Sequence, residues 1–247
     1  MKINRLLMTA IFSFVGVLAV AQSWMMQPQG PVNEFSAIEG TSVLNYNFQV
    51  ERNIHSRAGN GPVFYIFPDC KLDNNQALEL AGNLDLVNII KEYGGRIMVV
   101  NPSSDKWQEQ DLEDFRRLIG MGSSPTNVKV IGIGSGATFV NRQLVATELA
   151  GVIAGIVSID GEPGKICRLP VPAFIGGKNA AKAAKPYQTT SDSAPADPLQ
   201  KVVVNTDKKA SLETLFAEAW DKVLSANYRY NNLYRTFYTS RGIDNPE

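Results

Sequence analysis

Histidine is almost absent from this chain of 247 residues, because His55 is the only one. A hydrolase that activates a serine needs a base within hydrogen-bonding distance of the hydroxyl, and histidine supplies that base most often. His55 comes early in the chain, and we expect it to be a solvent-exposed turn residue. With one histidine and two cysteines, the chain is not expected to form a structural zinc site or to bind another metal.

An excess of charge is also missing, because 24 basic residues balance 24 acidic ones. A basic surface attracts nucleic acid and anionic lipid, and this balance gives no reason to expect either partner. No internal repeat is visible. The one long apolar run lies at the N-terminus, so no membrane span is expected beyond it.

That N-terminal run is typical of a secretory signal peptide. Lys2 and Arg5 give a positive start, residues 6–20 are apolar, and Ala19 and Ala21 form a small-x-small cleavage site. The run is too short to span a membrane comfortably, which disfavours an anchor. We therefore expect a signal peptide over residues 1–21 and a secreted or periplasmic protein.

The two cysteines, Cys70 and Cys167, each follow a predicted strand. Export permits disulfides, and both residues are expected at the same edge of the sheet. A disulfide between them and two separate buried thiols remain alternatives.

Strands and helices are expected to alternate along most of the chain. After a linker over residues 22–40, alternating residues over 41–55 predict an antiparallel strand pair at the edge of a sheet. Helical spacing over 75–93, 107–119, 138–149 and 211–224 separates short apolar runs typical of buried strands. Residues 41–247 therefore predict one α/β domain with a mostly parallel central sheet and helices on both faces. Residues 178–200 are expected to form a flexible insertion.

A glycine-rich turn follows the predicted strand over residues 128–131. It contains Gly132, Gly134 and Gly136, with Ser135 beside the central glycine, and a helix is expected to follow. Strand, sharp turn and helix form the nucleophile elbow of serine hydrolases, G-x-S-x-G, with the serine at the apex. Here Gly134 takes the apex position, and Ser135 stands one position later.

Together with the loops Pro68-Asp69-Cys70 and Asn101-Pro102, this order of elements resembles the α/β-hydrolase fold. It is most similar to secreted esterases of the polyhydroxybutyrate depolymerase and feruloyl esterase type, over residues 63–177. The resemblance implies a serine triad that hydrolyses esters, with Asp69 and Cys70 in the oxyanion loop.

The chain departs from that family at each triad position. Gly134 replaces the nucleophile, residues 176–180 hold no carboxylate, and residues 205–210 hold no histidine. Ser135 is a candidate nucleophile whose side chain is expected to point toward the helix. Asp160, at the end of a predicted strand, is the candidate acid, and a structural turn acid is its alternative role.

A dinucleotide site is a further alternative. Gly132, Gly134 and Ala137 match the G-x-G-x-x-G/A fingerprint, and Asp160 would take the ribose hydroxyls. The motif follows two earlier strand–helix units, and an exported protein meets little nicotinamide cofactor. We therefore expect no cofactor.

The predicted function is a secreted, non-catalytic α/β-hydrolase-like domain, a pseudoenzyme that binds or scaffolds or forms the first part of a longer esterase. Its expected partner is a polysaccharide or an ester polymer, or a downstream catalytic domain. Aromatic residues over 228–238 would suit such a polymer, or would pack as an amphipathic helix. The alternative function is an active serine esterase that uses Ser135.

Overall fold

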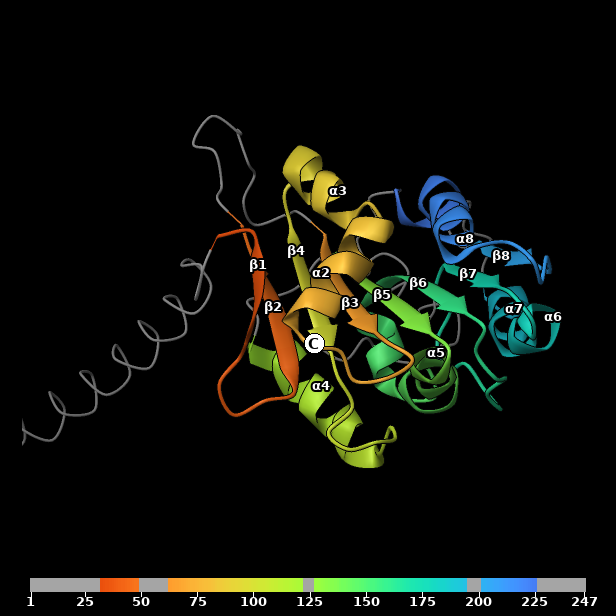
Figure 1. Ribbon diagram of the computed structural model, residues 1–247. Coiled ribbons are helices and arrows are strands. Elements are labelled where there is room, and N and C mark those ends of the chain that lie inside the picture. The colour runs from red at the N-terminus through yellow and green to blue at the C-terminus, as the bar shows by residue number, and fades with distance from the viewer. Residues whose placement is uncertain (1–31, 49–61, 122–126, 195–200, 226–247) are drawn as a thin grey trace, which may run out of the picture.

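The computed structural model describes residues 32–48, 62–121, 127–194 and 201–225. Strands in these ranges form one sheet in the order β1-β2-β4-β3-β5-β6-β7-β8 (Figure 1). They are β1 (Glu34–Ala37), β2 (Val43–Asn47), β3 (Val63–Phe67), β4 (Arg96–Val100), β5 (Val128–Ile133), β6 (Ile153–Ile159), β7 (Ala173–Gly176) and β8 (Val202–Asn205). β1 and β2 run antiparallel to their neighbours, and the other six strands run parallel.

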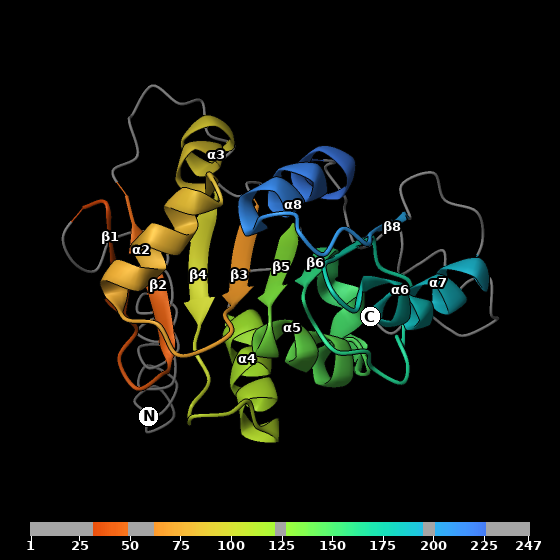
Figure 2. The same cartoon turned by 45° about the vertical axis from the view of Figure 1, so that its right-hand side comes forward.

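Helices cover both faces of the sheet, as Figure 2 shows. One face carries α2 (Asn74–Asn83), α3 (Leu86–Tyr93), α8 (Leu212–Ala219) and the short η3 (Trp220–Leu224). The other carries α4 (Glu109–Met121), α5 (Ser135–Phe139), η1 (Val140–Leu144), η2 (Glu148–Val152), α6 (Ala180–Ala183) and α7 (Lys185–Asp192). The predicted mostly parallel sheet with helices on both faces is confirmed, and so are the strand, sharp turn and helix predicted around Gly134.

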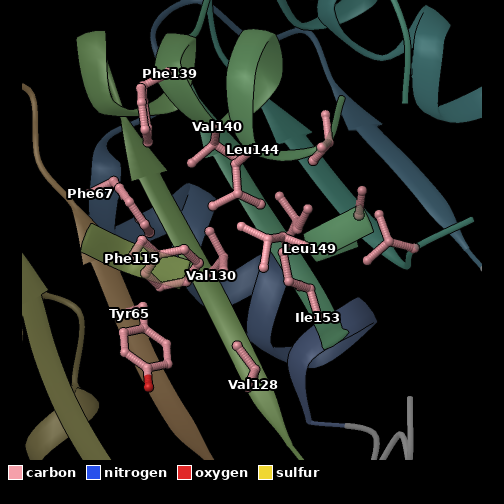
Figure 3. Close-up of a cluster of buried hydrophobic side chains, with 14 of the residues drawn as sticks. Tyr65, Phe67, Phe115, Val128, Val130, Phe139, Val140, Leu144, Leu149 and Ile153 are labelled. Atoms are coloured by element: carbon pink, nitrogen blue, oxygen red, sulfur yellow. The ribbon is translucent and has the colours of Figure 1, made fainter. Parts of the chain in front are cut away.

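Aromatic rings fill the core between β3, α4 and α5 (Figure 3). Phe67 of β3 meets Phe115 of α4 edge to face at 5.0 Å and stacks on Phe139 of α5 at 5.8 Å. Trp107, before α4, stacks on Phe139 at 4.7 Å. Such ring pairs add to the stabilisation from area burial, and they hold α5 against the end of β3.

Two predicted segment boundaries in the first half of the chain are wrong. The helix expected over residues 75–93 is two helices, α2 and α3, because Asp85 between them adopts a positive φ of 54°. The expected linker over 22–40 includes β1, which pairs with β2 from Glu34↔Asn47 to Ala37↔Leu44. The edge strand pair therefore begins before residue 41.

Two segments of the second half also differ from the prediction. The helix expected over 138–149 is α5 followed by a π-helical turn, η1, and a 3-10 turn, η2. The described part of the expected flexible insertion (178–200) contains α6 and α7, and Tyr187 of α7 is buried. Alanines at 180, 183 and 184 give these helices an apolar face against the sheet.

Some predictions fall outside the described residues. These are the signal peptide over 1–21, the exposure of His55 and the aromatic segment over 228–238. Among the helices that are described, none has the length and apolar character needed to cross a membrane.

Candidate functional site

The turn between β5 and α5 has the geometry of an elbow. Gly134 adopts φ 56° and ψ −116°, a conformation that a side chain would strain. Its N–H donates to the carbonyl oxygen of Ile159 at 2.9 Å, and its own carbonyl accepts from the N–H of Thr138 at 3.0 Å. The apex is therefore bonded to β6 on one side and to the first turn of α5 on the other.

The two flanking glycines permit close approach of backbone segments. A Cβ at Gly136 would lie 2.5 Å from the carbonyl oxygen of Pro68, and one at Gly132 would lie 2.6 Å from Cα of Ala137. A Cβ does not approach non-bonded atoms this closely in proteins. Any side chain at either position would therefore push α5 away from β3 and β5. The backbone conformation or the close packing at each of the three positions of the turn thus explains why the residue is glycine.

The carboxylate of Asp69 fills the space where an apex side chain would stand. A Cβ added at Gly134 would overlap Oδ1 of Asp69 and would lie 2.5 Å from its Cγ. The same Oδ1 accepts the backbone N–H of Ser135 at 2.6 Å. Asp69 follows β3, so its side chain reaches from the end of β3 to the turn after β5. The neighbouring ends of these two strands are a switch point of the sheet, because the helices that follow them, α2 and α5, lie on opposite faces.

The loop that carries Asp69 is held at its other end. The buried amide of Asn101 accepts the N–H of Leu72 and donates to the carbonyl of Leu72, both at 2.9 Å. Asp73 then begins α2 with a capping box to Gln76. These bonds limit the positions that Asp69 can take, so its contact with the elbow belongs to an anchored loop.

Ser135, the candidate nucleophile, is the first residue of α5. Its hydroxyl donates to the carbonyl oxygen of Asp69. A backbone carbonyl is not a base that could take the hydroxyl proton, and no histidine lies among the described residues. Among the described residues, the hydroxyl of Ser135 is therefore bonded to a backbone carbonyl and not to a side-chain base.

Asp160, the candidate acid, makes a contact of the same kind with the next loop. It follows β6 with φ 57°, and its N–H donates to the carbonyl of Gly176 at 3.0 Å. Its Oδ1 accepts the N–H of Lys178 at 2.8 Å and occupies the space of a Cβ at Gly177. A carboxylate thus reaches the loop where the resemblance implies a triad acid, and it is bound there to backbone.

A buried polar network beside Asp160 was not predicted. The hydroxyl of Tyr187 donates to Oδ1 of Asn141 at 2.8 Å, and Nδ2 of Asn141 donates to the carbonyl of Glu162 at 2.9 Å. Burial raises the pKa of Tyr187 well above its ordinary value, so the phenol stays protonated. The network joins η1, α7 and the loop after β6. No local sequence motif predicts this network, since its members are far apart in sequence.

The two cysteines are both free, so the disulfide alternative is not realised in this structure. Cys70 is exposed, whereas Cys167 is buried and its Sγ donates to the carbonyl of Leu169 at 3.1 Å. Burial raises the pKa of Cys167 to about 12. One thiol faces solvent and the other lies in the core, so the alternative of two buried thiols holds for Cys167 and is wrong for Cys70.

The groups that would bind a dinucleotide at this fingerprint are hydrogen-bonded to other parts of the chain. The N–H of Ser135, which would meet a pyrophosphate, bonds to Asp69, and the carboxylate of Asp160 bonds to Lys178. Among the described residues, no group of three histidine, cysteine, aspartate or glutamate side chains could hold a metal ion.

Among the comparisons with known proteins, the search of solved structures alone gives matches. No protein-family model matches the chain, and no curated protein matches it either. Similar solved structures include a phospholipase/carboxylesterase from Dyadobacter fermentans, at 11% identity over 77% of this chain and 99% of that one, with a TM-score of 0.48. A second is an acylaminoacyl peptidase in complex with Z-Gly-Gly-Phe-chloromethyl ketone, at 12% identity over 81% and 43% with a TM-score of 0.46.

A third is the acylaminoacyl peptidase of Pyrococcus horikoshii, at 12% identity over 87% of this chain and 42% of that one, with a TM-score of 0.42. The chain spans less than half the length of either peptidase. These structural similarities concern the backbone fold and assign no activity to the chain.

Proposed function

We propose that this chain is a non-catalytic domain with an α/β-hydrolase-like fold, which binds or scaffolds and does not hydrolyse esters by itself. The observation that carries the proposal is the carboxylate of Asp69, which occupies the apex space of the elbow and accepts the N–H of Ser135. A hydrolase would need that space for its nucleophile and that N–H for its oxyanion.

The oxyanion hole explains why this contact matters for chemistry. In this fold one oxyanion donor is the backbone N–H of the residue after the nucleophile, which is Ser135 here. Donors of this kind act by meeting the negative charge that develops in the transition state. A carboxylate already bonded to the donor brings a negative charge to the same place, so it would repel a developing oxyanion.

Two further parts of the proposal rest on the sequence. The resemblance to polyhydroxybutyrate depolymerases and feruloyl esterases supports descent from secreted polymer-ester hydrolases. A polysaccharide, an ester polymer or a downstream catalytic domain would then be the partner, outside the cell or in the periplasm. Pull-down of the purified chain with insoluble polyester and polysaccharide particles tests the two polymer partners, and absence from every pellet would contradict both.

Ester turnover tests the catalytic part of the proposal. With para-nitrophenyl acetate, the chain and its Ser135→Ala variant should give the same rate as buffer. Gly134→Ser and Asp69→Ala should also stay at that rate, because neither change supplies a base. Turnover by the unaltered chain that Ser135→Ala abolishes would contradict the proposal. Turnover by Gly134→Ser alone would reveal a base outside the described residues.

A further inference from the structure

The last strand of the sheet has an unpaired edge within the described part of the chain. β8 pairs with β7, and Figures 1 and 2 show it at the end of the sheet. The carbonyls of Lys201 and Asn205 accept from β7, so by the two-residue period of a strand Val203 also faces β7. The N–H and C=O groups of Val202 and Val204 therefore point outward.

The side chains of this edge are apolar and partly accessible. Val202, Val203 and Val204 are all half-buried, and no charged residue lies within the strand. A shallow cavity of about 360 Å³ opens beside Val202, lined also by Gln188, Ser191 and Asp192 of α7. Edges with free backbone groups and apolar side chains are templates for pairing with another strand.

The opposite edge of the sheet is different. β1 carries the exposed Glu34 in its first position, and Glu39 follows the strand. A charge within an edge strand is a common device against pairing. Of the two edges, β8 is thus the one suited to pairing.

We propose that the outer edge of β8 pairs antiparallel with the β8 edge of a second copy of this chain, so that two sheets join across a twofold axis near Val204. Lys201 before the strand and Asp207 after it are both exposed. Residues 205–207 form a turn in which the N–H of Asp207 donates to Oδ1 of Asn205. Antiparallel pairing centred on Val204, with this turn extended, brings Lys201 of each copy opposite Asp207 of the other. The edge is self-complementary in charge and in backbone donors and acceptors, as an isologous interface requires.

The overall charge of the chain permits this association. Because basic and acidic residues balance, two copies approach without long-range repulsion. The inference is independent of the proposed function, since β8 contributes no residue to the contact between Asp69 and the elbow.

Sedimentation equilibrium of the purified chain, over a wide range of concentration, tests the proposal. A monomer–dimer equilibrium is expected. Lys201→Glu and Asp207→Lys should each weaken the dimer, about tenfold in Kd, because two like-charge pairs replace two attractive ones. The double variant Lys201→Glu/Asp207→Lys should restore it.

Val204→Pro is a second variant, since it removes the outward N–H at the axis and should abolish the dimer. Circular dichroism checks that each variant stays folded. A chain that remains monomeric throughout, or a dimer that is indifferent to the charge reversals, would overturn the proposal. Higher assemblies that grow with concentration would also overturn it, because a twofold contact closes on itself.

Discussion

Two loops at the carboxyl edge of the sheet use the same contact. In one, Asp69 after β3 reaches Gly134 and bonds to the N–H of Ser135; in the other, Asp160 after β6 reaches Gly177 and bonds to the N–H of Lys178. Both glycines have positive φ, 56° and 91°. In each case the carboxylate takes the space that a Cβ would fill, and it ties together the loops that follow two neighbouring strands.

The two contacts differ in their position. The Asp160–Gly177 contact lies toward the β8 end of the sheet, whereas the Asp69–Gly134 contact lies between the ends of β3 and β5 and also holds the hydroxyl of Ser135. There the carboxylate occupies the space beside the apex of the turn. The comparison teaches that glycine at the apex has a structural role of its own, because it leaves room for the Asp69 carboxylate.

The largest effect is expected from a methyl group at the apex. Gly134→Ala should lower the free energy of unfolding by about 2–4 kcal/mol, since it combines positive-φ strain with eviction of the Asp69 carboxylate. Gly177→Ala should cost less, because Cγ of Asp160 lies 2.9 Å from the added Cβ, against 2.5 Å for Cγ of Asp69. Urea unfolding of both variants measures the difference, and an apex variant as stable as the unaltered chain would contradict the description of the contact.

A buried lysine should make stability depend on pH, independently of both loop contacts. Lys129 of β5 is 1% exposed, and burial lowers its pKa to about 7. Its Nζ lies 3.8 Å from the position of a Cβ at Gly155, and Cδ2 of Leu224 lies 3.1 Å from the same position. Between pH 7 and the ordinary lysine pKa, the unfolded chain binds a proton that the folded chain does not.

Stability should therefore rise with pH from about 7 to about 9, by at most about 1.4 kcal/mol per pH unit from this group. Above about pH 9 the unfolded chain also loses the thiol proton that the buried Cys167 keeps, which opposes the rise. Below about pH 7 the amine is charged in both states, so its burial cost is complete and constant. Lys129→Met should flatten the rise, whereas Asp69→Ala and Asp160→Ala should keep it. Urea titrations at a series of pH values check this, and an equally steep rise in Lys129→Met would contradict it.

Coupling between the partners of one contact should be smaller but specific. In the Asp69→Ala background, Gly134→Ala no longer evicts a carboxylate, so its cost should fall by about 1 kcal/mol. Asp160→Ala serves as the matched control, because it belongs to the other contact and should be additive with Gly134→Ala. Equal coupling in both cycles would show that the loops do not act separately.

The smallest expected effects come from the carboxylates alone. Asp69→Ala and Asp160→Ala should each cost about 1 kcal/mol, the typical worth of one hydrogen bond at an accessible site. Asparagine at either position keeps an acceptor oxygen, so its cost should be lower. Thermal unfolding compares the four variants; an asparagine variant less stable than its alanine counterpart would contradict the assignment.

The sequence predicts the architecture better than it predicts the site. Uninterrupted apolar runs predict the central strands, and the helical spacing over 211–224 predicts α8 and η3. The break at Asp85 and the helices over 180–192 are missed, because they depend on a local positive φ and on packing against the sheet. Asp69 is expected in the oxyanion loop, but its contact with Gly134 spans two strands, and no local pattern encodes that distance.

Covalent labelling of Ser135 tests the central claim most directly. After incubation of the full chain with a fluorophosphonate, peptide mass spectrometry reads the modification of each serine. The account predicts no adduct on Ser135 in the unaltered chain or in Asp69→Ala, because no base activates the hydroxyl. A stoichiometric phosphonyl adduct on Ser135 in the unaltered chain would contradict it.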